Sequence, residues 1–283
     1  MLDRAIIFVA IIKDNYVKMA CNAAMTFSSQ NIHTILLTSR ELHEKHKDLI
    51  SKYFQTVHYT ETVDPGKAKM EVLSLKDAKT ILYIDADSLA SFSCNLNESF
   101  EYFETKNWDF WVWAYSVTNT EGHVQNFWAN MKRMKERFPE ILENKKIANG
   151  TQSSFFFFNT QSEKVQCLAK KTIEVFESLK NNRIGLTSKW MRDFIPDELL
   201  LTISCSICNI DVDNFTDNFI KLGLIERTNK IDRNYFYNDR NIMTFPSGSY
   251  KLRSSLKNIY NEVTLRHCRE KSIKPFYSYQ QKI

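Results

Sequence analysis

Two acidic side chains, Asp85 and Asp87, are the residues of this sequence best placed to do chemistry. They directly follow an apolar run, Thr80 to Ile84, and a single residue separates them. The run predicts a buried strand, and ligands of open α/β sheets gather outside the carboxyl ends of the strands. Two carboxylates at that place can hold a hard divalent cation, which can bridge the oxygens of a diphosphate. The alternative is that the two acids shape a turn or cap the next helix, as Asp after a strand frequently does.

The scarcity of glycine limits how this protein could bind a phosphate. The 283 residues include six glycines, and no two lie close enough to form G-x-G-x-x-G or a P-loop. This excludes dinucleotide-binding Rossmann enzymes, P-loop NTPases and protein kinases. A diphosphate would have to be met by side chains and an ion.

Composition and charge place the chain among ordinary globular proteins. Apolar residues make up 43% and charged residues 25% of it, which excludes a disordered or collagenous chain. From Ile225 onward there are 12 Lys and Arg against 5 Asp and Glu, a balance of +7. Because the whole chain carries +5, the residues before Ile225 carry −2. Such a basic segment attracts an anion, whether nucleotide diphosphate, nucleic acid or membrane surface, or it is simply a solvated surface.

Cysteines and hydropathy bear on the compartment. The six cysteines have no repeated spacing, which predicts buried reduced thiols, and the C-x-x-C of Cys205 and Cys208 favours a helix core over zinc. The apolar run from Ala5 to Ile12 is too short to span a membrane. We therefore expect a soluble protein of the cytoplasm, either bacterial or, for a phage protein, of the host cell.

Strand-like and helix-like segments alternate along the first half, which predicts an α/β fold with a doubly wound, mostly parallel sheet flanked by helices. The four consecutive phenylalanines from Phe155 to Phe158 suit a central strand buried on both faces. The expected strands are 5–12, 32–38, 56–59, 80–84, 108–115 and 152–159, and the expected helices are 15–30, 41–53, 67–78, 127–142, 161–180 and 196–209.

Five segments together resemble the GT-A glycosyltransferases, most closely the family 8 enzymes. They are similar, in order, to the family's first strand with its Asp-Tyr turn, its D-x-D segment, a glycine-containing strand, a helix led by Asp-Gln, and a closing His…Lys-Pro-Trp. Here Glu198 stands for the Gln, Phe276 stands for the Trp, and the glycine between His267 and Lys274 is missing. The segments are Phe8–Tyr16, Thr80–Leu89, Asn149–Asn159, Pro196–Leu201 and His267–Phe276.

The resemblance implies a GT-A fold over residues 1–283, with a basic C-terminal extension. Residues 1–115 would bind the nucleotide sugar, 116–210 would face the acceptor, and 211–283 would close over the diphosphate. It also implies a Mn²⁺ or Mg²⁺ ion held by Asp85, Asp87 and His267. Tyr16 would stack on a uracil ring or serve as a core aromatic. The residues implied in binding the donor are Ala10, Ile11, Asp14, Tyr16, Lys67, Asp85, Ala86, Asp87 and Lys274.

Asp197 and Glu198 would then carry catalysis. Sugar transfer passes through an oxocarbenium-like state. A carboxylate beside the anomeric carbon can stabilise this state, act as the nucleophile, or take the proton of the acceptor. The resemblance implies retention with help from the leaving phosphate, although Glu198 is a better nucleophile or base than Gln. The alternative is a plain helix start, where Pro196, Asp197 and Glu198 are all favoured.

These expectations combine into a metal-dependent glycosyltransferase that uses a nucleotide-sugar donor, UDP-linked, with a glycan, a protein or a hydroxylated DNA base of phage type as acceptor. A sugar platform of Trp108, Trp111 and Trp113 competes with a core role for these residues. The competing functions are a nucleotidyltransferase on a related sheet and a nucleic-acid-binding protein with a decayed site.

Overall fold

The computed structural model describes residues 1–119, 129–141, 146–182, 186, 195–216, 224–225, 242–244, 254–276 and 278. Its main sheet has the strand order β3-β2-β1-β4-β7-β6. The strands are β1 (Leu2–Ala10), β2 (His33–Thr38), β3 (Thr56–Tyr59), β4 (Ala78–Ile84), β6 (Phe110–Asn119) and β7 (Lys146–Asn159). β1, β2 and β3 pair in parallel, whereas β6 and β7 pair antiparallel. The predicted mixed sheet is therefore present.

The chain divides into two compact units that interleave along the sequence. Unit 1 comprises Met1–Asp3, Thr62–Leu82 and Thr105–Asn218, and unit 2 comprises Arg4–Glu61, Tyr83–Glu104 and Phe219–Ile283. The functional division into 1–115, 116–210 and 211–283 stays a prediction, and much of the last part lies outside the described residues.

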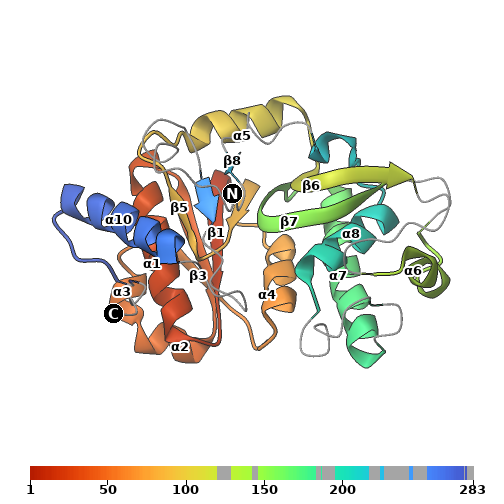
Figure 1. The fold of residues 1–283 in the computed structure, drawn as a ribbon, viewed down its shortest axis with the longest axis horizontal. Coiled ribbons are helices and arrows are strands. Elements are labelled where there is room, and N and C mark those ends of the chain that lie inside the picture. Colours follow the sequence, from red (N-terminus) through yellow and green to blue (C-terminus); the bar gives the residue numbers. More distant parts are fainter. Residues whose placement is uncertain are drawn as a thin grey trace. The chain divides into compact units, whose positions relative to one another are not determined.

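Unit 2 is a parallel β-sheet with helices. It contains α1 (Asp14–Phe27), α2 (Arg40–Lys45), α3 (Lys47–Ile50), α5 (Leu96–Thr105) and α10 (Ser254–Glu270). A second sheet joins β5 (Ser88–Ala90), β9 (Ile242–Thr244) and β8 (Leu224–Ile225). α10 packs against α1 and crosses it, as Figure 1 shows in blue and red. The expected helix 41–53 is broken at His46, which lies between α2 and α3 and adopts a non-helical backbone.

Unit 1 consists of the β6–β7 ribbon with α4 (Pro65–Glu71), α6 (Met131–Arg137), α7 (Glu163–Asn181) and α8 (Asp197–Ile207). α8 packs against β7, and α7 packs against α8 (Figure 1). Phe155 to Phe158 are all fully buried, which confirms the central-strand prediction. The expected helix 67–78 ends early, because a 3-10 turn at Val72–Ser74 leads into β4.

Two sequence expectations about side chains are corrected in unit 1. Cys167 of α7 and Cys208, the residue after α8, form a disulfide, so the prediction of six reduced thiols is wrong for this pair. Their pairing depends on how α7 packs against α8. It could not be predicted from the sequence, in which the two cysteines are 41 residues apart. Trp111 is fully buried and its indole Nε1 donates to the Asn214 carbonyl at 3.1 Å, so it belongs to the core and not to a sugar platform.

Candidate active site

The turn after β4 presents the two carboxylates that the sequence singles out. The Ser88 amide donates to the Asp85 carbonyl at 3.0 Å, which closes a turn over Asp85–Ser88. The Tyr83 hydroxyl donates to Asp85 Oδ1 at 2.5 Å and thereby orients this carboxylate. Asp87 is buried, with 8% of its surface exposed, and so is Ala86. The prediction that these residues form a turn is confirmed. The turn carries two carboxylates, those of Asp85 and Asp87, with one residue between them.

His267, the third predicted ligand, makes contacts of its own near the end of β5. It lies in the last turn of α10, where its Nε2 donates to the Ala90 carbonyl at 3.1 Å and its ring stacks on Phe92. Ala90 is the last residue of β5, about 10 Å along an extended chain from Asp87. Burial lowers the pKa of this imidazole and keeps it neutral. Among the described residues, no three His, Cys, Asp or Glu side chains form a group that could hold a metal ion.

The turn after β1 has an unusual backbone. Ile12 has a φ of 74°, and the Lys13 amide donates to the Ile11 carbonyl at 2.9 Å, which together define a γ-turn of the rare positive-φ kind. Strained β-branched residues of this kind gather at ligand sites. Ala10 and Ile11 are buried whereas Ile12 is half exposed, so the turn shows its strained residue to solvent at the carboxyl end of β1.

Asp14 and Tyr16 occupy the first turn of α1, directly after this strained segment. Asp14 Oδ2 accepts from Lys45 Nζ at 2.6 Å, and His46 Nε2 lies 3.3 Å from Asp14 Oδ1. These hydrogen bonds, that of Lys45 first, hold the pKa of the Asp14 carboxyl below its ordinary value. Tyr16 is half-buried. Both residues therefore lie at the same strand edge as Ala10 and Ile11.

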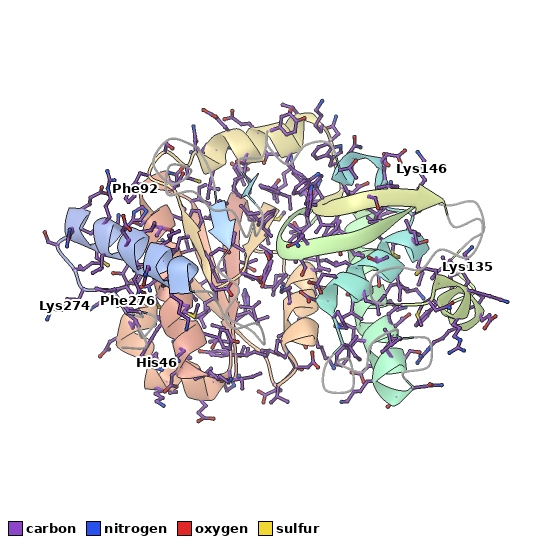
Figure 2. The ribbon with its side chains drawn as sticks, in the orientation of Figure 1. His46, Phe92, Lys135, Lys146, Lys274 and Phe276 are labelled. Atoms are coloured by element: carbon purple, nitrogen blue, oxygen red, sulfur yellow. A yellow bond between two sulfur atoms is a disulfide. The ribbon has the colours of Figure 1, made fainter. Side chains whose placement is uncertain are left out.

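The C-terminal segment after α10 contacts α1 and the residue Tyr53. The Phe276 amide donates to Asn22 Oδ1 at 3.1 Å, and the Phe276 ring contacts Tyr53 at a centroid distance of 5.1 Å. Lys274 is exposed, and Figure 2 shows it near Phe276. Asn22 lies two turns into α1, so this anchor is well removed from the turn that begins α1.

The second acidic pair is held in a polar cluster within unit 1. Asp197 and Glu198 are the first two residues of α8, as the helix-start interpretation requires, because acidic groups stabilise a helix N-terminus. Lys69 Nζ of α4 lies 2.5 Å from Asp197 Oδ2, with 14% and 16% of the two side chains exposed. The Ser153 hydroxyl of β7 donates to the same oxygen at 2.6 Å, and Lys69 Nζ lies 3.3 Å from Ser153 Oγ.

The pKa values of the two carboxyls in this cluster are shifted in opposite directions. For Asp197, burial pushes the pKa upward, but the charge and hydrogen bond of Lys69 and the bond from Ser153 bring it below the ordinary value. For Glu198, burial raises the pKa well above the ordinary value and the neighbouring charge of Asp197 raises it further. The surroundings therefore favour the ionised form of Asp197 and the protonated form of Glu198.

Close backbone packing positions this pair. A Cβ on Gly66 of α4 would lie 2.8 Å from the Ile195 carbonyl oxygen and 3.7 Å from the Asp197 amide nitrogen. Only glycine lets α4 approach the segment before α8 so closely. The Thr151 hydroxyl also donates to the Glu198 carbonyl at 3.0 Å. Both ends of the Ile195–Glu198 segment are thus fixed by its neighbours.

Sequence reasoning missed two members of this cluster, Lys69 and Ser153. Lys67 Nζ pairs with Glu177 of α7 at 2.6 Å, while Lys69, two residues on, reaches Asp197. The one signal for the β7 member in the sequence was Ser153, a polar residue that closely precedes four buried phenylalanines on a buried strand. Lys67 as a donor contact stays a prediction.

Comparison with solved structures identifies the fold. A galactosyltransferase, LgtC, in complex with donor and acceptor sugar analogs superposes with a TM-score of 0.51 at 12% identity, covering 94% of this chain and 99% of that one. The apo form of mouse xyloside xylosyltransferase 1 superposes with a TM-score of 0.50 at 10% identity, covering 89% of this chain and 100% of that one. No family model and no curated protein sequence matches the chain. The chain has the GT-A fold of glycosyltransferases.

No helix in the described part of the chain is long and apolar enough to cross a membrane.

Proposed function

We propose that the chain is a glycosyltransferase that moves a sugar from a nucleoside-diphosphate donor, UDP-linked, to a hydroxyl acceptor. The observation that carries this proposal is the carboxylate pair Asp85 and Asp87 on the turn that follows a buried strand of a GT-A fold. Carboxylates at such a strand end can meet the charge of a diphosphate through a cation. The chain has no glycine-rich loop that could do so instead.

Asp85 and Asp87 fit a hard divalent cation, because both offer carboxylate oxygen and the Tyr83 hydroxyl fixes one of them. They would hold Mn²⁺ or Mg²⁺, an ion that supplies positive charge to a leaving diphosphate when bound. His267 as a third ligand stays a prediction, since its Nε2 is bonded to Ala90.

The other residues that we propose to contact the sugar donor lie at the carboxyl end of β1, in the C-terminal segment and at the start of α8. We expect Ala10, Ile11, Asp14 and Tyr16 to receive the base and ribose. Their position at the strained turn after β1 and in the first turn of α1 supports this expectation. Lys274 is an exposed cation able to add a point charge near the phosphates. Asp197 and Glu198 would face the sugar in the reacting complex.

The deciding experiment uses metal-dependent hydrolysis of the donor, which needs no acceptor. We would screen UDP- and GDP-sugars with the wild type in Mn²⁺, Mg²⁺ or EDTA and measure the nucleotide released. One UDP-sugar should be hydrolysed in Mn²⁺ and not in EDTA, and Asp85→Asn with Asp87→Asn should abolish this. The matched control is Asp213→Asn, an exposed acid paired only with Lys146 among the described residues. Hydrolysis by the double variant at the wild-type rate would refute the proposal.

The acceptor is a hydroxyl of a glycan, a protein or a modified DNA base, and the three are separable. With the donor identified, transfer to each class would be followed by mass shift. For a DNA acceptor, binding should weaken steeply as salt rises, because phosphate contacts release counterions. A glycan or protein acceptor should lack this slope.

A further inference from the structure

Three helices of unit 1 are tied to one another in a closed ring. Lys67 Nζ of α4 pairs at 2.6 Å with a glutamate of α7, and Lys69 Nζ of α4 lies 2.5 Å from Asp197 Oδ2 of α8. The disulfide of Cys167 and Cys208 joins α7 to the end of α8. The three helices also pack against one another pairwise (Figure 1). Of these three links the disulfide is the covalent one, and it is the link that a thiol breaks.

The disulfide lies at the opposite end of α8 from the candidate catalytic pair. Asp197 begins the helix, and Cys208 directly follows its last residue. The 11 residues of α8, at about 1.5 Å each, separate the two ends by about 16 Å. Lys69 and Ser153 hold the first end, and Cys167 holds the second. Because a packed helix shifts as one rigid element, freeing its second end displaces the first. A shift of about 1 Å at a reacting group can lower a rate about a hundredfold.

The middle of α8 carries polar groups that favour its release. The hydroxyls of Thr202, Ser204 and Ser206 are buried, and none of them forms a hydrogen bond in the described part of the structure. A buried hydroxyl without a partner destabilises the packed state, because it has given up its bonds to water. Movement of α8 away from its neighbours would give these hydroxyls water as a partner. The disulfide therefore opposes a displacement that the side chains of α8 themselves favour.

We propose that the disulfide of Cys167 and Cys208 is a redox lock on α8, which a dithiol opens to lower sugar transfer and a small disulfide closes to restore it. The effect on transfer rests on the proposed function. Cys205, which forms a C-x-x-C with Cys208, takes no part in the exchange. Its thiol is buried, and burial raises the pKa of that thiol, so the reactive thiolate does not form.

The exchange proceeds through the more accessible of the two sulfurs. Cys167 is half-buried, whereas 6% of the surface of Cys208 is exposed. A thiolate of the dithiol attacks Cys167 Sγ, the S–S bond breaks, and its electron pair leaves on Cys208 Sγ, which takes a proton. The second thiol of the reagent attacks the mixed disulfide and frees Cys167 as a thiol. The reagent becomes a cyclic disulfide, so two electrons and two protons pass to the protein.

The activity test follows donor hydrolysis by the wild type before and after reduction with dithiothreitol, which is removed under nitrogen before Mn²⁺ is added. Reduction should lower hydrolysis at least tenfold, and oxidised glutathione should restore it. Cys167→Ala with Cys208→Ala should have the low rate throughout, whereas Cys205→Ala, the matched control in the same helix, should respond as the wild type does. An unchanged rate in wild type with all six thiols free would overturn the inference.

Hydrogen exchange followed by mass spectrometry gives a second readout that needs no substrate and no variant. In the reduced wild type, the amides of α8 should exchange at least tenfold faster than in the oxidised protein, while those of β6 in the same unit should not change. An unchanged rate in α8, or an equal rise in β6 from unfolding of the whole unit, refutes the lock even in an active enzyme. Faster exchange confined to α8, in a protein that hydrolyses no donor when oxidised, leaves the lock standing and refutes the proposed function.

Discussion

Lys69 Nζ and Asp197 Oδ2 lie 2.5 Å apart and join α4 to the first turn of α8. The two side chains come from positions 128 residues apart in the chain and are each largely buried. The ion pair links the placement of the candidate catalytic segment to α4, whose last turn leads into β4. It also favours the ionised form of Asp197, because the charge and hydrogen bond of Lys69 lower the pKa of that carboxyl.

Breaking this pair from one side should destabilise the protein strongly. Lys69→Met leaves Asp197 without its counter-charge in a largely buried site, and a loss of about 3 kcal/mol in the free energy of unfolding is expected. Urea unfolding followed by circular dichroism measures it. The double variant Lys69→Met with Asp197→Leu should recover part of the loss, because no unpaired charge remains. Simple additivity of the two single losses would show that the pair is not coupled.

The sequence allowed the sheet and the two acidic pairs to be predicted because these depend on local pattern. Apolar runs mark β1, β4 and β7, and Asp85, Asp87, Asp197 and Glu198 follow or begin an element directly. Lys69 and Ser153 could not be assigned to Asp197 in the same way, because three elements meet there and no spacing rule links them. The disulfide of Cys167 and Cys208 is hidden for the same reason.

His267 shows the converse case. The order of the motifs predicts that it lies beside Asp85 and Asp87. This stays a prediction, because the structure shows its Nε2 bonded to the Ala90 carbonyl and its ring stacked on Phe92. Order along the chain predicts which elements exist better than it predicts which side chains meet.

Gly66→Ala should destabilise the protein although alanine is the better helix former. The new Cβ would lie 2.8 Å from the Ile195 carbonyl oxygen, a backbone atom with little freedom to move. We expect a loss of about 1–3 kcal/mol in the free energy of unfolding, from overpacking, and a lower transfer rate from displacement of Asp197. Thermal and urea unfolding together with the donor hydrolysis assay measure the two effects. A gain in stability, as helix propensity alone predicts, would contradict the close packing.

Ile12→Gly should leave the protein more stable than Ile12→Ala does. Both changes remove the same half-exposed side chain, but only glycine accepts a φ of 74° without strain. The expected difference in the free energy of unfolding is about 1 kcal/mol in favour of glycine. Equal stabilities would show that the turn after β1 is unstrained in solution. Nucleotide affinity measured by calorimetry on the same two variants reports whether the turn must be held in this shape to bind.

Reducing the disulfide between Cys167 and Cys208 should weaken the packing of α7 on α8. The bond closes a loop with a sequence separation of 41, for which loop entropy predicts a contribution of about 3–4 kcal/mol to the free energy of unfolding. Cys167→Ser and Cys208→Ser should each lose this amount, and the double variant should lose no more than either single one. Thiol titration of the unreduced, denatured wild type should count four thiols, matching the free cysteines 21, 94, 205 and 268. A count of six, or losses that add in the double variant, would show that the two sulfurs are not bonded in solution.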